Sequence, residues 1–212
     1  MKITKLGHCC LLVEENGLRI LTDPGMYTVE AQSKMNNLDL ILITHEHADH
    51  LHSDSLKTLV ANNPKAKIIT NKGVGKILEG ISLTFALLEN GQEESFSDVT
   101  ISGHGETHQA IYPGIPQVNN TGYFIAGKFF YPGDALTNAG KPVELLALPV
   151  CGPWLKLSEV IDYAKELRPK SAFPVHDGML NRAGSFHDLP KKVLAENGIA
   201  FFVPELEKEF GI

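Results

Sequence analysis

The stretch that decides the fold reads Leu38-Asp-Leu-Ile-Leu-Ile-Thr44-His45-Glu-His47-Ala-Asp49-His50. Its first half is a short apolar block, rich in leucine and isoleucine, with the length of a buried strand. Its second half places three histidines and one aspartate within a few residues. A strand that ends at Thr44 delivers these side chains to a loop at the edge of a sheet, where they can converge. The stretch therefore predicts a metal site at the end of a strand.

The residue types and their spacing indicate which metals the site suits. Imidazole and carboxylate groups without a thiolate suit zinc, manganese or iron. His45 and His47 lie two residues apart, so an extended segment points them to the same side, toward one ion. Asp49 and His50 follow as the chain turns and are placed to reach a second ion. The alternative interpretation is a polar surface loop. Three histidines and an aspartate at this spacing favour the metal site over that alternative.

Length, composition and charge narrow the class of protein. The chain has 212 residues, of which 43% are hydrophobic and 21% charged, as in ordinary globular proteins, and we expect a single domain over residues 1–212. A net charge of −6 makes nucleic acid an improbable partner. No apolar stretch reaches membrane-spanning length, and the first residues lack the apolar core of a secretion signal. Three cysteines, Cys9, Cys10 and Cys151, are predicted to be free thiols, which favours the cytoplasm.

Strands and helices are predicted to alternate in two similar halves. In the first half we expect strands over 2–6, 10–14, 18–22 and 67–70, a loop over 26–37, and helices over 54–61 and 74–78. In the second half we expect strands over 99–102, 123–126, 128–131, 145–150 and 172–175, and helices over 157–167 and 189–195. Two β-rich segments, each followed by helices, predict an α/β (α+β) sandwich of two mixed β-sheets with helices on the outer faces.

Further metal-capable residues stand just after predicted strands. His108 follows the strand that ends at residue 102, Asp134 follows Pro132-Gly133, and His176 directly follows Val175. One histidine at the end of a strand is more often a structural or surface residue. Three such residues in addition to the first cluster indicate a site with donors enough for two metal ions.

These residues resemble the signature of the metallo-β-lactamase superfamily of hydrolases. The motif His45-x-His47-x-Asp49-His50 matches it, as does the later order of histidine, Gly-Asp and histidine. The resemblance covers nearly the whole chain and implies a four-layer αββα sandwich with the site at one edge of the sheets. The start of the chain, from Leu6-Gly7-His8 to Asp23-Pro24, is similar to the small metal-dependent hydrolases that include the ascorbate-6-phosphate lactonases.

The resemblance also implies a set of ligands and a reaction. One divalent ion is expected on His45, His47 and His108, a second on Asp49, His50 and His176, and Asp134 is expected to bridge them. Zinc is the expected metal, with manganese or iron as alternatives. The implied enzyme is a dinuclear hydrolase in which a hydroxide between the metals attacks an ester, lactone or phosphodiester bond of a small molecule. Asp49 would orient the hydroxide, and His8 would donate a proton to the leaving group unless it only caps its own loop.

Several positions depart from particular branches of the superfamily. Asp134 speaks against antibiotic hydrolysis, because the true lactamases usually lack this aspartate or have cysteine there. His47 stands where the di-iron, oxygen-reducing branch typically has glutamate. Tyr131 stands where many relatives of the lactonases have histidine. A di-iron redox or gas-sensing protein, a nucleic-acid phosphodiesterase and a non-catalytic binding module remain the alternatives, and the sequence leaves the substrate and the oligomeric state open.

Four other side chains have simpler interpretations. His52 is expected near the start of a helix, and His187 on the surface. His104 competes with His108 for the ligand role, and the family spacing favours His108. Trp154 follows an apolar strand and either packs there or lines a pocket.

Overall fold

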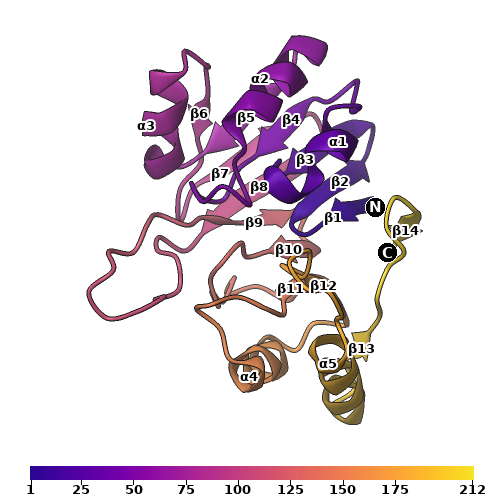
Figure 1. The fold of residues 1–212 in the computed structure, drawn as a ribbon. Helices are drawn as coiled ribbons and strands as arrows, with labels where there is room; N and C mark the ends of the chain where they lie inside the picture. The colour runs from indigo at the N-terminus through magenta and orange to yellow at the C-terminus, as the bar shows by residue number, and fades with distance from the viewer.

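Two sheets form the centre of the computed structural model, which describes residues 1–212 (Figure 1). Across the first sheet the strands run in the order β14 (Glu209–Gly211), β1 (Lys2–Gly7), β2 (Cys10–Glu15), β3 (Leu18–Thr22), β4 (Leu40–Leu42), β5 (Lys67–Thr70) and β6 (Ala86–Leu87). Across the second sheet they run in the order β13 (Ala200–Phe201), β12 (Ser171–Val175), β11 (Leu145–Pro149), β10 (Phe129–Tyr131), β9 (Gly122–Ile125), β8 (Val99–His104) and β7 (Glu93–Phe96). Both sheets mix parallel and antiparallel pairs, as predicted.

Helices cover the outer face of each sheet, which completes the predicted αββα order of layers (Figure 1). The first sheet carries the short 3-10 helix η1 (Met26–Thr28) and the helices α1 (Val29–Gln32), α2 (Ser53–Asn62) and α3 (Lys72–Gly80). The second sheet carries α4 (Leu157–Leu167) and α5 (Ser185–Glu196). No helix has both the length and the hydropathy that a membrane crossing requires.

Three apolar clusters hold the four layers together. The central cluster lies between the sheets and joins Leu42 of β4 to Phe129 of β10. A second cluster packs Ile41 of β4 against α2 and α3, and a third packs β10 and β11 against α4 and α5. Adjacent residues of a strand point to opposite faces, so Ile41 and Leu42 enter different clusters. A strand buried on both faces has no polar side to show, which explains the unbroken apolar run before the histidines.

Parallel strands bring the site to one edge of the sandwich. Strands β3, β4 and β5 are mutually parallel, and so are β10, β11 and β12. The carboxyl ends of neighbouring parallel strands lie at the same edge of a sheet, where loops can gather functional side chains. The loops after β3, β4, β10 and β12 all contribute to the site described below.

The structure differs from the sequence-based expectation in several places. The expected loop over residues 26–37 contains η1 and α1, and α3 starts at Lys72 because the Asn71 side chain accepts hydrogen bonds from the next backbone N–H groups. Helix α5 begins at Ser185, ahead of the predicted residue 189, and continues through Pro190. The short strands β6, β13 and β14 were not predicted, because two or three residues are too few for a periodic signal.

Candidate metal centre

The candidate ligands lie on loops that follow four different strands. The segment from His45 to His50 follows β4, whereas His108, Asp134 and His176 follow β8, β10 and β12. The structure brings these residues into two groups, in each of which the candidate ligand atoms lie within 4.8 Å of one another. All seven residues predicted as ligands belong to one group or the other.

The first group contains His45, His47, His108 and Asp134. Nε2 of His45 lies 3.2 Å from Nδ1 of His47 and 3.8 Å from Oδ2 of Asp134. Nε2 of His108 lies 3.4 Å from the same oxygen. Zinc–nitrogen bonds of about 2.0–2.1 Å in a tetrahedral site place two ligand atoms about 3.3 Å apart. These separations therefore suit four donors around one ion.

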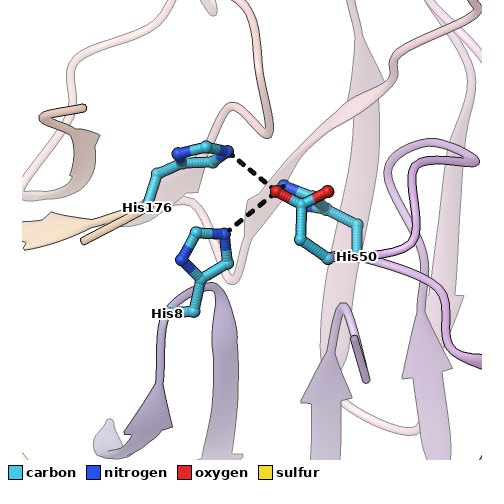
Figure 2. A group of neighbouring side chains, drawn as sticks. His8, His50 and His176 are labelled. Carbon is cyan, nitrogen blue, oxygen red and sulfur yellow. Dashed lines mark hydrogen bonds and ion pairs between the residues drawn. The ribbon is translucent and has the colours of Figure 1, made fainter. Parts of the chain in front are cut away.

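The second group contains His8, Asp49, His50 and His176. Figure 2 shows dashed lines from His8 and His176 that meet at one carboxylate oxygen. This oxygen is Oδ2 of Asp49, which lies 3.2 Å from Nε2 of His8 and 3.3 Å from Nε2 of His176. Nε2 of His50 lies 3.9 Å from that oxygen. Asp49 is the most exposed donor of this group, with 21% of its side-chain surface accessible, so one face of the group remains open to a substrate.

Asp134 contacts both groups. Its Oδ1 lies 3.1 Å from Nε2 of His50, and its Oδ2 lies 2.9 Å from Nε2 of His176. The same Oδ2 faces His108 in the first group. The carboxylate is buried and its loop is fixed, because the Asp134 N–H donates to the side chain of Asn120 at 3.0 Å. Its position between the groups is the one that a bridging ligand occupies.

The ring tautomers of the donor histidines follow from their partners. Nδ1 of His50 lies 2.6 Å from Oδ2 of Asp23, and Nδ1 of His108 lies 2.5 Å from the carbonyl oxygen of Gln109. An acceptor at that position places the proton on Nδ1 and leaves the lone pair of Nε2 free. In both residues Nε2 is the atom that faces the other donors. Each imidazole therefore presents a metal-ready nitrogen to the cluster.

Asp23, fully buried at the end of β3, orients two of these rings. Its carboxylate accepts hydrogen bonds from the backbone N–H and the hydroxyl of Thr44, both at 2.7 Å, and from the hydroxyl of Tyr131 at 2.6 Å. Because the Thr44 hydroxyl donates to Asp23, it accepts from Nδ1 of His45, 3.0 Å away. Asp23 therefore fixes His50 directly and His45 through Thr44. This role was not predicted from the sequence, although an aspartate directly after a buried strand could have indicated it.

His8 has the opposite tautomer. The backbone N–H of Gly178 donates to Nδ1 of His8 at 3.1 Å, which leaves the proton on Nε2 for the hydrogen bond to Asp49. Burial lowers the pKa of His8. The charge of Cys9 and the hydrogen bond to Asp49 raise it by more, so the pKa of His8 lies above its ordinary value. The backbone N–H of Gly178 opposes a second proton on Nδ1, because it already occupies the lone pair of that atom. His8 therefore positions Asp49, and its role as proton donor stays a prediction.

Buried polar atoms without partners test whether the site fits a metal. Five of the six buried side-chain atoms that make no hydrogen bond of acceptable geometry belong to the cluster: His50 Nε2, His108 Nε2, Asp134 Oδ1, and both Nδ1 and Nε2 of His176. The polar atoms nearest to them are other candidate ligand atoms, as in the 3.1 Å approach of His50 Nε2 to Asp134 Oδ1. A buried polar atom without a partner carries an uncompensated desolvation cost. A cation among them removes that cost for the atoms it binds, so the donor set fits one, and its nitrogen and oxygen atoms suit zinc, manganese or iron.

The charges of the cluster also favour a cation. Burial alone would raise the pKa of Asp134, but the charges of His50 and His176 hold it well below its usual range. Burial lowers the pKa of His50, yet the charges of Asp134, Cys9 and Asp23 raise it well above its usual range. Burial also holds His45 well below its ordinary pKa. The carboxylates remain ionised and attract positive charge, which a proton or a metal ion can supply.

Cys9 lies at the base of the cluster, close to His50 and Asp134. Burial raises the pKa of its thiol, but His8 and His50 lower it to about 6. The sequence predicted only that Cys9 is a free thiol, and it is unpaired in the structure. Its proximity to two donors is a finding that required the fold.

The backbone around the site adopts conformations that side chains usually avoid. His8, Asp23 and His176 have φ values of 45°, 36° and 59°, and the left-handed region costs a non-glycine residue about 1–2 kcal/mol. Such outliers concentrate at functional sites. Gly25 allows η1 to approach the histidine loop, because a Cβ there would lie 1.7 Å from the carbonyl oxygen of Asp49. The close approach explains why a glycine follows Asp23-Pro24.

Two histidines set aside in the sequence lie outside both groups. His104 directs its Nε2 to the hydroxyl of Ser102 at 2.9 Å and packs edge-on against Phe124. The structure thus brings His108, and not His104, to the candidate centre. His52 caps α2 by accepting a hydrogen bond from the backbone N–H of Ser55, as its place near a helix start predicted.

The expectation for His187 was wrong. Its Nε2 lies 3.0 Å from Oδ2 of Asp177, and its side chain is only 17% exposed rather than free on the surface. The buried Lys5 donates to Oδ1 of the same aspartate at 2.7 Å. These contacts anchor the residue that follows His176. No local pattern indicated the pairing, because His187 lies in a part of α5 that begins ahead of the predicted residue 189.

Comparison with known proteins identifies the family. The beta-lactamase superfamily domain matches residues 2–176. The chain belongs to this superfamily. It is 33% identical over 185 residues to protein Rv0786c of Mycobacterium tuberculosis, with 85% of each chain covered. It is 28% identical over 194 residues to a metal-dependent hydrolase of Carboxydothermus hydrogenoformans, covering 83% of this chain and 84% of the relative.

A solved structure agrees with the fold of this superfamily member. The crystal structure of a proposed metal-dependent hydrolase from Parabacteroides distasonis superimposes with a TM-score of 0.77 at 25% identity. The match covers 96% of this chain and 92% of the other. The predicted membership of the metallo-β-lactamase superfamily and the predicted sandwich are therefore confirmed, whereas the roles of individual residues rest on the geometry above.

Proposed function

We propose that this superfamily member is a metal-dependent hydrolase that holds two divalent ions, with zinc as the preferred metal and manganese or iron as alternatives. The observation that carries the proposal is the position of Asp134 between the two groups of donors. Its Oδ1 faces His50 of the second group, and its Oδ2 lies between His176 of the second group and His108 of the first. His45, His47 and His108 would complete one site. The second would consist of Asp49, His50 and His176.

The chemistry follows from what each side chain can do. Divalent ions held by these donors would lower the pKa of a bound water toward neutrality and would polarise the oxygen of the bond under attack. The partly exposed Asp49 carboxylate could accept a hydrogen bond from that water and so orient it. His8 keeps the Asp49 carboxylate in one orientation through its Nε2–H. Asp23 keeps His45 and His50 in the tautomers that leave Nε2 free.

The proposed substrate is a small molecule with an ester, lactone or phosphodiester bond. A di-iron redox protein on the same donors is the main alternative, because imidazole and carboxylate also bind iron. A nucleic-acid phosphodiesterase is less favoured, since the hollow above the donors has no lysine or arginine in its lining. The cytoplasmic location expected from three free thiols stays a prediction.

Metal analysis combined with a substrate screen tests the proposal. The protein is purified without chelator, its metal content is measured, and the zinc-loaded and manganese-loaded forms are assayed against esters, lactones and phosphodiesters. We expect the parent protein to contain about two equivalents of metal and to turn over at least one of these substrates. We expect the Asp134→Ala variant to lose this turnover. A folded sample that stays metal-free in excess zinc and manganese contradicts the proposal. A coloured, iron-containing sample without hydrolytic turnover supports the redox alternative.

A further inference from the structure

The candidate centre opens into a small hollow. Its volume is about 280 Å³, and four metal donors, His47, Asp49, Asp134 and His176, line its floor. This volume lies near the lower end for ligand pockets. A substrate that reaches the donors therefore contacts the residues that line this open hollow.

The rest of the lining is almost entirely apolar. Apart from the donors and Ala48 it consists of Met26, Tyr27, Ile111, Pro153, Trp154 and Met179. These residues come from the loops or turns after β3, β8, β11 and β12. Four separate segments thus present apolar groups to the same space, as pockets for apolar ligands do.

Two of these side chains are exposed although they are apolar. Met26 is 51% exposed and Tyr27 is 45% exposed, both in η1 at the rim of the hollow. The ring of Tyr27 also packs near His8, with centroids 4.7 Å apart. Apolar surface that faces water beside reactive groups becomes buried when a ligand with an apolar part binds.

The protein lining of the hollow offers no cationic side chain to an anionic group of the substrate that lies away from the proposed metal ions. None of the 19 lysines and arginines of the chain lines it. Its two lining carboxylates, Asp49 and Asp134, are both at the floor. A phosphate or carboxylate held against Met26, Tyr27 and Trp154 would lose part of its hydration without gaining a cationic side chain as a partner, which is unfavourable.

A larger hollow elsewhere does not compete for this role. It has a volume of about 840 Å³ and includes Lys128, Lys141 and Lys170 in its lining. Each lysine is already paired with a glutamate, at 2.7 Å, 3.2 Å and 2.8 Å. That hollow contains none of the clustered histidines, so it lacks both a free cation and the donors for chemistry.

We propose that the site takes an uncharged carboxylic ester or lactone whose non-reacting part is a short alkyl chain or an aryl ring. This inference rests on the proposed hydrolase function for the reacting end. The oxygen of water adds to the acyl carbon, the acyl–oxygen bond breaks, and its electron pair leaves on the alcohol oxygen, which takes a proton. The products are a carboxylic acid and an alcohol from an ester, or a single hydroxy acid from a lactone, and the apolar part remains against Met26 and Trp154 throughout.

Trp154 provides a direct readout of binding. It is the only tryptophan of the chain, and its ring centroid lies 5.5 Å from that of His108 and 5.6 Å from that of His176. Its fluorescence is titrated with three uncleaved probes: N-methylhexanamide, N-methylacetamide and the mono-N-methylamide of adipic acid. We expect the hexanamide to bind at least about tenfold more tightly than the other two, since each buried methylene contributes about fourfold.

Hydrolysis by the zinc-loaded protein is compared over the matching 4-nitrophenyl esters. The hexanoate should exceed the acetate and the mono-adipate in kcat/KM by at least about tenfold. Met26→Ser should reduce the preference for hexanoate severalfold. Leu206→Ser, which changes another exposed apolar residue (58% exposed) outside the lining, should leave it unchanged.

The outcomes separate this inference from the proposed function. Hydrolysis of the adipate ester as fast as the hexanoate, or equal binding of the three amides, overturns the inference while the hydrolase proposal stands. Chain-length-dependent binding in a protein that cleaves none of the esters supports apolar recognition and contradicts the proposed hydrolysis. An equal loss of the hexanoate preference in the Met26 and Leu206 variants also overturns the inference.

Discussion

Replacing Asp23 with asparagine tests how the buried network prepares the metal centre. The carboxylate accepts four hydrogen bonds: one at Oδ1 from the Thr44 N–H, and three at Oδ2 from the Thr44 hydroxyl, Nδ1 of His50 and the Tyr131 hydroxyl. An asparagine has only one carboxamide oxygen, so its NH₂ group must face a donor in either orientation. If the oxygen takes the place of Oδ2, the NH₂ group faces the backbone N–H of Thr44. If it takes the place of Oδ1, three donors lose their acceptor.

The magnitude follows from the milder of the two orientations. Leaving one buried donor without an acceptor costs about 1–3 kcal/mol. A change of about 2 kcal/mol in the free energy of unfolding lowers the Tm of a chain of this size by about 4–8 °C. Disturbing the partner of a metal-binding histidine weakens metal affinity by about 10–100-fold. We expect the larger effect at the site that contains His50, because Asp23 contacts that ring directly.

The assay measures Tm by calorimetry and metal affinity by competition with a chelator, with Tyr131→Phe as the matched control. That control removes one donor to the same carboxylate and keeps the charge, so we expect a loss of about 1 kcal/mol and nearly unchanged metal affinity. The reasoning is refuted if Asp23→Asn binds both metals as tightly as the parent, or if Tyr131→Phe weakens binding equally.

Three further predictions concern the centre and its surroundings. Asp134→Ala should lower turnover by more than about 100-fold and reduce the metal content, with the folded state kept because the loop retains its backbone contacts; unchanged activity would remove Asp134 from the site. His8→Ala should keep two metals while turnover falls, most for substrates with poor leaving groups, and loss of a metal on analysis would make His8 a ligand. Burial raises the pKa of Asp177, but the contacts with His187 and Lys5 outweigh burial, so the pKa of Asp177 is lowered in the folded protein. The ionised Asp177 therefore stabilises the fold above the unfolded-state pKa of about 3.9, and this stabilisation is lost as the pH falls through the lower folded-state pKa. Lys5→Met should therefore destabilise the protein at pH 7 and flatten this acid-dependent loss, and parallel Tm–pH curves for the two proteins would show that the pair does not contribute.

Short-range chemistry explains why much of the architecture could be predicted from the sequence. The apolar block before His45 has to be buried on both faces, and a turn of polar donors after it has to lie at an edge. Helix α4 was predicted with its observed bounds because its apolar residues repeat with helical spacing. The two- and three-residue strands β6, β13 and β14 lack any such pattern, and only pairing with a neighbouring strand defines them.

The sequence by itself determined the donor types, their order along the chain and the strands that carry them, because these depend on residue identity and local periodicity. Only the tertiary structure decided which atoms meet: Nδ1 of His47 but Nε2 of His108, both oxygens of Asp134, and the position of Cys9 at the base of the cluster. It also decided that Asp23 sets the histidine tautomers and that His187 pairs with Asp177. These contacts join segments far apart in the chain, so their distances follow from the packing of the two sheets rather than from any local pattern.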